Sequence, residues 1–273
     1  MYLEIAGKLL SETLLSLYPV FVKNINLSLT IQLWSRFIAY VFISGFFVDW
    51  SFIFDNLVSY DGILLSGTTL LHVISSYRGF QLLESGIAWS VFYIYPLFIM
   101  LLAGETIPLI LLLAPLGVVL LTTQSSGSQI VHKEKYTFEG ILMIIIAAFT
   151  EALIYFLVRR VKTPNNWNHL FLSYGLGMIL VSIYGFREIM SIVSSKYSLV
   201  SWSLVLNSVF GLFGYYLRFF AAMRLSPKIY APLSYFGIIM AFIYGYVFNQ
   251  ERITLLKCIG VILCIIPSIY QLL

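Results

Sequence analysis

Apolar segments that are each long enough to cross a lipid bilayer fill almost the whole chain, and this feature limits the fold most strongly. A spanning helix needs about 20 mostly apolar residues, and ten such segments fit between short polar connections. They are expected at residues 3–22, 29–48, 60–80, 85–103, 107–123, 138–158, 168–187, 199–221, 229–249 and 253–271. Only 10% of the 273 residues are charged, whereas a soluble domain carries about 25%. We therefore predict an all-α membrane protein with ten transmembrane helices.

The most polar stretch of the chain, from Thr122 to Lys135, separates five predicted spans from the next five. We therefore predict a first five-helix repeat at 1–125, a connecting loop at 126–137 and a second five-helix repeat at 138–273. Because each half holds an odd number of spans, a duplicated second half must be inverted in the membrane. Two inverted repeats with a binding site at their interface are a recurring plan among transporters.

Each half places a glutamate beside a hydroxyl residue within its first apolar segment. The two stretches are Ser11-Glu12-Thr13-Leu14 and Thr150-Glu151-Ala152-Leu153. A carboxylate is costly inside a bilayer, so it usually faces the protein interior and serves a function. A structural alternative stays open for Glu12, because Lys8 lies one helical turn before it and could pair with it.

Further candidates lie on polar stripes at helical spacing, where the lining of an aqueous cavity is expected. The candidate substrate- or ion-binding residues are Glu12, Arg36, His72, Trp89, Tyr93, Glu151, Tyr155 and Asn207. Arg36 cannot readily lose its charge, so it needs a partner or water. It would hold an anionic substrate group, form an ion pair with Glu12, or extend its side chain to the nearby end of its span. His72 would relay protons or serve as a hydrogen-bonded neighbour. Helix–helix packing is the alternative for any single stripe, including those with Tyr155 and Asn207.

Trp89 and Tyr93 stand out among the many aromatic residues because they precede Pro96 in the fourth predicted span. A proline removes a backbone hydrogen bond and kinks a helix, and such a break is tolerated inside a membrane where it faces a cavity. An ordinary aromatic packing cluster is the alternative interpretation.

Charge and motifs argue against several classes of function. The net charge of +4 is scattered over short loops, which argues against nucleic-acid binding. The chain has no nucleophile elbow, no zinc-protease motif and no phosphate-binding loop. Cys258 and Cys264 point to different faces of one helix, so neither a disulfide nor a metal pair is expected. We predict neither an enzyme nor a bound metal or cofactor. Basic residues divide seven to eight between the two sides, so charge leaves the orientation open.

Scattered positions resemble a known family. They are Leu17-Tyr18-Pro19-Val20-Phe21-Val22-Lys23 at the end of the first span, Arg36, Pro96 with Glu105, and the pairs Gly104-Glu105 and Gln250-Glu251 before the fifth and tenth spans. Together with the ten-span pattern they resemble the EamA-like branch of the drug/metabolite transporter superfamily. The resemblance implies cytoplasmic termini, a central cavity between spans of both halves, peripheral fifth and tenth spans, and alternating access.

We thus predict a multi-pass secondary transporter that moves a small polar organic metabolite or drug-like solute across the cell membrane. The expected partners are the small-molecule substrate and the lipid bilayer, with proton coupling through Glu12 or Glu151 as a further hypothesis. Gly237, Ala241 and Gly245 form a row of small residues that allows close helix contact, within the chain or in a homodimer. Two alternatives remain: a membrane-embedded enzyme acting on a lipid, and a membrane subunit that does not transport.

Overall fold

Helices make up all the regular structure in the described part of the chain. The computed structural model describes residues 2–25, 27–106, 109–123, 133–194, 202–250 and 252–272. In chain order the elements are α1 (Tyr2–Leu15), α2 (Tyr18–Asn24), α3 (Leu29–Gly45), α4 (Trp50–Asn56), α5 (Tyr60–Leu82), α6 (Ser85–Phe92), α7 (Tyr95–Leu102), the 3-10 helix η1 (Leu109–Leu112), α8 (Leu113–Thr123), α9 (Lys133–Arg160), α10 (Asn166–Tyr184), α11 (Phe186–Ser194), α12 (Trp202–Arg224), α13 (Pro227–Ser234), α14 (Phe236–Asn249) and α15 (Leu255–Leu272).

Several of these helices have the length and apolar composition of membrane spans. Within the described residues, four segments meet both criteria: Tyr2–Val22, Phe138–Arg160, Leu204–Arg224 and Pro227–Asn249. The bent pairs α4 with α5 and α10 with α11 raise the number to six if each pair counts as one span. The structure is thus that of a multi-pass membrane protein, and the count of ten spans remains a prediction.

Three of the predicted spans are broken into two helices. The first is interrupted after α1 at Ser16, the fourth after α6 at Tyr93, and the ninth after α13 at Tyr235. Pro19 and Pro96 lie in the first turns of α2 and α7, where their missing N–H groups are tolerated. The kink expected beside Pro96 is present, whereas the first and ninth predicted spans were expected to be continuous. At the first break the carbonyl of Ser16 accepts a hydrogen bond from the side chain of Trp89.

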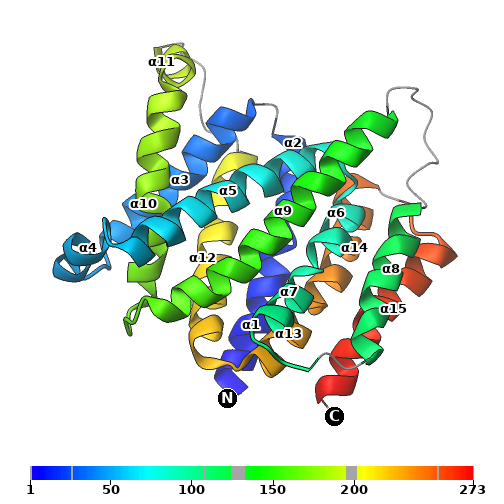
Figure 1. Cartoon of the computed structure of the whole chain (residues 1–273). Helices are drawn as coiled ribbons and strands as arrows, with labels where there is room; N and C mark the ends of the chain where they lie inside the picture. The colour runs from blue at the N-terminus through cyan, green and yellow to red at the C-terminus, as the bar shows by residue number, and fades with distance from the viewer. Residues whose placement is uncertain are drawn as a thin grey trace.

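The helices pack in pairs that link the two halves of the chain (Figure 1). The close pairs include α1 with α12, α5 with α9, α3 with α10, α8 with α15, α6 with α14 and α7 with α13. In a duplicated chain the first predicted span corresponds to the sixth, the second to the seventh, and so on. Under this correspondence the pair α1–α12 matches the pair α9–α5, and the pair α6–α14 matches the pair α13–α7. The pairs α3–α10 and α8–α15 map onto themselves. This is the contact pattern that two repeats related by a two-fold axis would produce.

Two features of the connections differ from the sequence expectation. α9 begins at Lys133, so the predicted loop at 126–137 ends in helix, while residues 124–132 lie outside the described part. The segment 50–56, predicted as a loop, forms the short helix α4, which is bent by 88° from α5. Asp49 caps α4 by accepting hydrogen bonds from the Ser51 hydroxyl and from backbone N–H groups, and these bonds lower the pKa of its carboxyl group.

The row of small residues on α14 packs inside the chain. Gly237, Ala241 and Gly245 are all buried, and α14 contacts α1 and α6. A Cβ atom at Gly237 would overlap the hydroxyl of Tyr93 and lie 3.0 Å from Glu12 Oε2. The row therefore permits close packing within one chain, and a homodimer would need another surface.

Candidate functional site

Glu12 lies at the centre of the helix assembly and is fully buried on α1. Both of its carboxylate oxygens accept hydrogen bonds from Nη2 of Arg218, at 2.9 Å each. Lys8, one turn earlier on α1, donates to Oε1, and Tyr93 donates to Oε2. The pairing of Lys8 with Glu12, left open from the sequence, is therefore present together with contacts from two other helices.

Glu151 is the corresponding acid of the second half and is 3% exposed on α9. Its Oε1 accepts a hydrogen bond from Nη1 of Arg218 at 2.8 Å. Its Oε2 lies 3.4 Å from Nε2 of His72 and 3.5 Å from the hydroxyl of Tyr215. The two glutamates chosen from the sequence thus meet through one arginine.

Arg218 on α12 joins the carboxylates of the two halves, and it was not among the predicted site residues. It is 1% exposed, although it lies three residues before the predicted end of the eighth span. The sequence places it on a polar stripe with Asn207, Gly211 and Gly214, and that stripe runs along the buried face of α12. Paired, hydrogen-bonded charges are the form in which a membrane interior tolerates ions. We call Lys8, Glu12, His72, Glu151 and Arg218 the charged centre.

His72 on α5 has a defined tautomer in this arrangement. Its Nδ1 lies 2.9 Å from the carbonyl oxygen of Ala147, which can only accept, so Nδ1 carries a hydrogen. Its Nε2 faces the hydroxyl of Tyr215 at 2.8 Å and the carboxylate of Glu151 at 3.4 Å. Nε2 can therefore accept a hydrogen bond from Tyr215 or, once protonated, donate to Glu151.

The acid–base contacts follow the pairing of the helices. Glu12 and Arg218 face each other across the pair α1–α12, while Glu151 and His72 face each other across the pair α9–α5. The two pairs are joined by the contact of Arg218 Nη1 with Glu151, and by the hydroxyl of Tyr215 on α12, which lies near His72 and Glu151. The charged centre therefore consists of two acid–base units with a link between them.

Trp89 and Tyr93 make their hydrogen bonds at the breaks in the first and fourth predicted spans. Trp89 donates from its indole nitrogen to the carbonyl of Ser16 at 3.2 Å, at the break between α1 and α2. Tyr93 at the break between α6 and α7 reaches Glu12. Both rings also pack on each other, with centroids 5.2 Å apart. Trp89 and Tyr93 therefore form an aromatic packing cluster, and Tyr93 within this cluster also contacts Glu12.

Arg36 on α3 lies among tyrosines and is 1% exposed. Its guanidinium carbon is 4.6–5.5 Å from the ring centroids of Tyr18, Tyr40, Tyr77, Tyr174 and Tyr215. It donates to the hydroxyls of Tyr174 at 2.8 Å and Tyr77 at 3.4 Å. None of the ion pairs among the described residues involves it, so the proposed pairing of Arg36 with Glu12 is absent. We call Arg36 and these five rings the tyrosine cage.

Asn207 and Tyr215 connect this cage with α12. Asn207 donates from its amide nitrogen to the hydroxyl of Tyr77 at 2.7 Å. The ring of Tyr215 stacks against both buried arginines, with Arg36 at 5.1 Å and Arg218 at 5.4 Å. The cage is therefore a neighbour of the charged centre, with which it is in contact through Tyr215.

Tyr155 lies outside both groups. Its hydroxyl donates to the carbonyl of Leu225 at 3.1 Å and accepts from Arg159 at 2.7 Å, and its ring packs on Tyr230. It closes the end of the bundle where α9 meets the link between α12 and α13. Four of the eight predicted site residues are thus members of the two groups: Glu12, Arg36, His72 and Glu151. Tyr93 and Asn207 each donate a hydrogen bond to a member, and Trp89 packs on Tyr93. Tyr155 is set apart from them.

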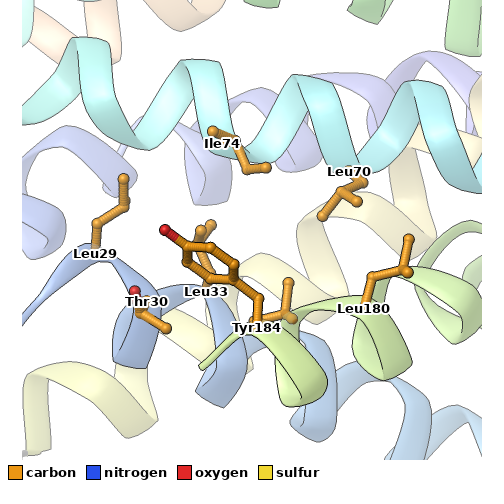
Figure 2. Close-up of a pocket in the computed structure, with 8 residues that line it drawn as sticks. Leu29, Thr30, Leu33, Leu70, Ile74, Leu180 and Tyr184 are labelled. Carbon is orange, nitrogen blue, oxygen red and sulfur yellow. The ribbon is translucent and has the colours of Figure 1, made fainter. Parts of the chain in front are cut away.

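A separate pocket of about 420 Å³ opens between α3, α5 and α10 (Figure 2). Its walls are mostly aliphatic: Leu29, Thr30, Leu33, Leu70, Ile74, Leu180, Val181 and Tyr184. None of the eight predicted site residues lines it. Several of its residues, including Leu180 and Tyr184, are exposed on the outer surface of the bundle, so the pocket suits a hydrocarbon group. Across the described ranges, no three His, Cys, Asp or Glu side chains gather as metal ligands would.

The second half of the chain identifies the family. Residues 138–270 match the model of the EamA-like transporter family. This part of the chain belongs to that family. The family resemblance predicted from the sequence is therefore confirmed for this part of the chain, and the long apolar helices make the chain a membrane protein.

The fold of the whole chain is also seen in a solved protein. A crystal structure aligns with 97% of this chain and 94% of its own, with a TM-score of 0.67 and 14% sequence identity. At this identity the likeness shows the fold alone. No curated protein matches the chain in sequence.

Proposed function

We propose that the chain is a secondary transporter that carries a small polar organic solute across the cell membrane by alternating access. The observation that carries this proposal is the contact of Arg218 with Glu12 and Glu151, because it joins buried acids from the two halves of the chain. Buried charges of this kind mark solute and ion pathways in membrane proteins, and transporters place such sites between inverted repeats.

The helix pairs support a division into two inverted five-helix repeats. Their exchange pattern is the one expected from a two-fold axis between residues 1–125 and 138–273. Both termini lie at the same end of the assembly (Figure 1), as an even number of spans requires. Ten spans with both termini in the cytoplasm are consistent with this arrangement.

The charged centre suggests which contacts change during transport. Glu12 with Arg218 belongs to the unit α1–α12, and Glu151 with His72 belongs to the unit α5–α9. Rocking of one unit against the other preserves the contacts within each unit and separates Arg218 from Glu151. Glu151 then takes up a proton through His72, which avoids an unpaired buried carboxylate in the open state. This step would couple transport to a proton gradient.

The proposal is tested by binding and flux. Purified protein is first screened by thermal shift against amino acids, nucleotides, sugar phosphates and drugs, and compounds that stabilise it are then offered to vesicles that contain the protein. We expect saturable uptake that depends on a pH gradient and that falls at least ~10-fold in Glu151→Gln. Empty vesicles and the exposed variant Arg224→Gln serve as controls. Uptake that never exceeds that of empty vesicles, for any compound of the panel, contradicts the proposal.

A further inference from the structure

The buried ionisable groups around the two sites carry more positive than negative charge. Three cations, Lys8, Arg36 and Arg218, stand against two carboxylates, Glu12 and Glu151, and all five are at most 3% exposed. Lys8 and Arg218 both contact a carboxylate. The surplus charge therefore belongs to Arg36, whose neighbours are aromatic rings and hydroxyls. A buried guanidinium needs compensation in a medium as apolar as a membrane protein interior.

The tyrosine cage also holds more hydrogen-bond donors than acceptors. Tyr77 and Tyr174 both accept hydrogen bonds from nitrogen donors, so the hydrogens of their own hydroxyls remain free to donate. Among the described residues, Nε of Arg36 is buried without a partner, and both hydroxyls are found there only as acceptors of hydrogen bonds. Tyr18 and Tyr40 share one hydrogen bond, which leaves one further hydroxyl hydrogen free.

Asn207 leaves the excess of donors unchanged. Its Oδ1 is buried and unpaired among the described residues, while its amide nitrogen donates to Tyr77. If the amide is turned over, Tyr77 donates to Oδ1 and the two amide hydrogens become free instead. A buried donor without an acceptor is unfavourable. A group that fits such a set is an acceptor with negative charge and several oxygens, that is, a carboxylate or a phosphate.

We propose that Arg36 and the tyrosine cage bind the anionic group of the transported solute, a carboxylate or a phosphate. This inference rests on the proposed transport function and adds the class of substrate to it. The planar guanidinium and the hydroxyls of Tyr77 and Tyr174 act as donors to the anion. Tyr215, which touches both arginines, places the bound anion next to the charged centre.

Two kinds of compound could supply such an anionic group. The first source is a water-soluble organic anion. The second is a membrane amphiphile, because the pocket lies on the same helices as the cage: Leu33 is one turn before Arg36 on α3, and Ile74 is one turn before Tyr77 on α5. In that case the anionic group would lie in the cage and an alkyl chain in the pocket.

The test compares matched anionic and neutral compounds on the purified full chain. The probes are benzoate and benzamide, glucose 6-phosphate and glucose, and laurate and lauramide, each measured by the shift in the thermal unfolding midpoint. At about 100 times its Kd, a ligand should raise the midpoint by roughly 5 °C. We expect a shift from at least one anion and no shift from its neutral partner. A response to laurate alone identifies the amphiphile as the source, and a response to the other anions identifies the soluble one.

Three variants locate the binding in the cage. Arg36→Gln should weaken binding of the responding anion roughly 10- to 100-fold. Arg36→Lys and Tyr174→Phe should weaken it less, and these milder changes keep the test valid if Arg36→Gln does not fold. Arg224→Gln removes the same charge from an exposed site at the end of α12, so it should bind like the wild type. Equal shifts from neutral and anionic partners, no shift from any of the three anions, or undiminished binding in the variants would overturn the inference.

The outcomes separate this inference from the proposed function. If vesicles transport only uncharged or cationic solutes, transport stands and the anion site fails. If anions bind through Arg36 but no solute crosses the membrane, the anion site stands and transport fails.

Discussion

Arg218 and Glu12 are 206 positions apart in the chain, yet Nη2 of the arginine lies 2.9 Å from both oxygens of the carboxylate. The same guanidinium binds Glu151 through Nη1. Arg218 therefore compensates one acid from each half of the chain, and its removal affects both.

The first prediction concerns the loss of this shared cation. Arg218→Gln leaves Glu151 without a cationic partner and Glu12 with Lys8 alone. Removing one partner of a buried ion pair costs about 3–5 kcal/mol. We expect a clearly lower unfolding midpoint for purified Arg218→Gln, while the exposed Arg224→Gln should stay close to the wild type. The double variant Arg218→Gln with Glu151→Gln should recover part of the loss, because it removes the uncompensated acid. Equal midpoints for Arg218→Gln and Arg224→Gln would show that the bridge contributes nothing to stability.

The second prediction separates the roles of the two glutamates. The cationic partners of Glu12 lie within the unit α1–α12, whereas Glu151 makes the link between the units. Glu12→Gln should therefore lower stability by about 3–5 kcal/mol, since Lys8 loses its carboxylate and Arg218 loses one of its two. Glu151→Gln should change flux more than stability, because a neutral amide cannot hold the closed state through an ion pair. Unfolding midpoints and vesicle flux are compared for both variants. The opposite order, with flux lost only in Glu12→Gln, would contradict the division into two units.

The third prediction concerns proton uptake through His72. His72→Gln can still donate to the carbonyl of Ala147, but its side chain cannot take up a proton. We expect the pH dependence of vesicle flux to flatten, with flux remaining measurable. His169→Gln is the matched control, because His169 is also buried but bonds to the carbonyls of Val158 and Val161 away from the charged centre. An unchanged pH profile in His72→Gln would remove this histidine from the coupling step.

The sequence predicted the class of fold and the two central acids well, for physical reasons. Long apolar segments have few alternatives to helix inside a membrane, and Glu12 and Glu151 are too costly there without a partner. Arg218 was placed on a polar stripe but not chosen as a site residue, because an arginine near a span end usually extends to the membrane surface. The packing of α12 against α1 brings it to Glu12, and hydropathy does not record which helices pack together.

The contacts of Arg36 were beyond sequence reasoning as well. Its surroundings come from the helices α2, α3, α5, α10 and α12, and only the packing of the two halves brings them together. The sequence offered Glu12 as a partner because both were buried ions of opposite charge. In the structure Arg218 pairs with Glu12 instead, and Arg36 contacts the rings and hydroxyls of tyrosines.

The last prediction uses the close approach of α14 to the charged centre. Gly237 faces Tyr93 and Glu12, so the added methyl group of Gly237→Ala would displace the Tyr93 hydroxyl from the carboxylate. Overpacking of this kind costs about 1–3 kcal/mol, and we expect lower flux in vesicles because Glu12 loses a donor. Gly67→Ala is the matched control: no atom lies within 4 Å of its new Cβ, and α5 gains up to about 1 kcal/mol of helix propensity. Stability and flux are measured for both variants. If Gly237→Ala matches Gly67→Ala in both, the contact between α14 and the charged centre has no role in holding the acid in place.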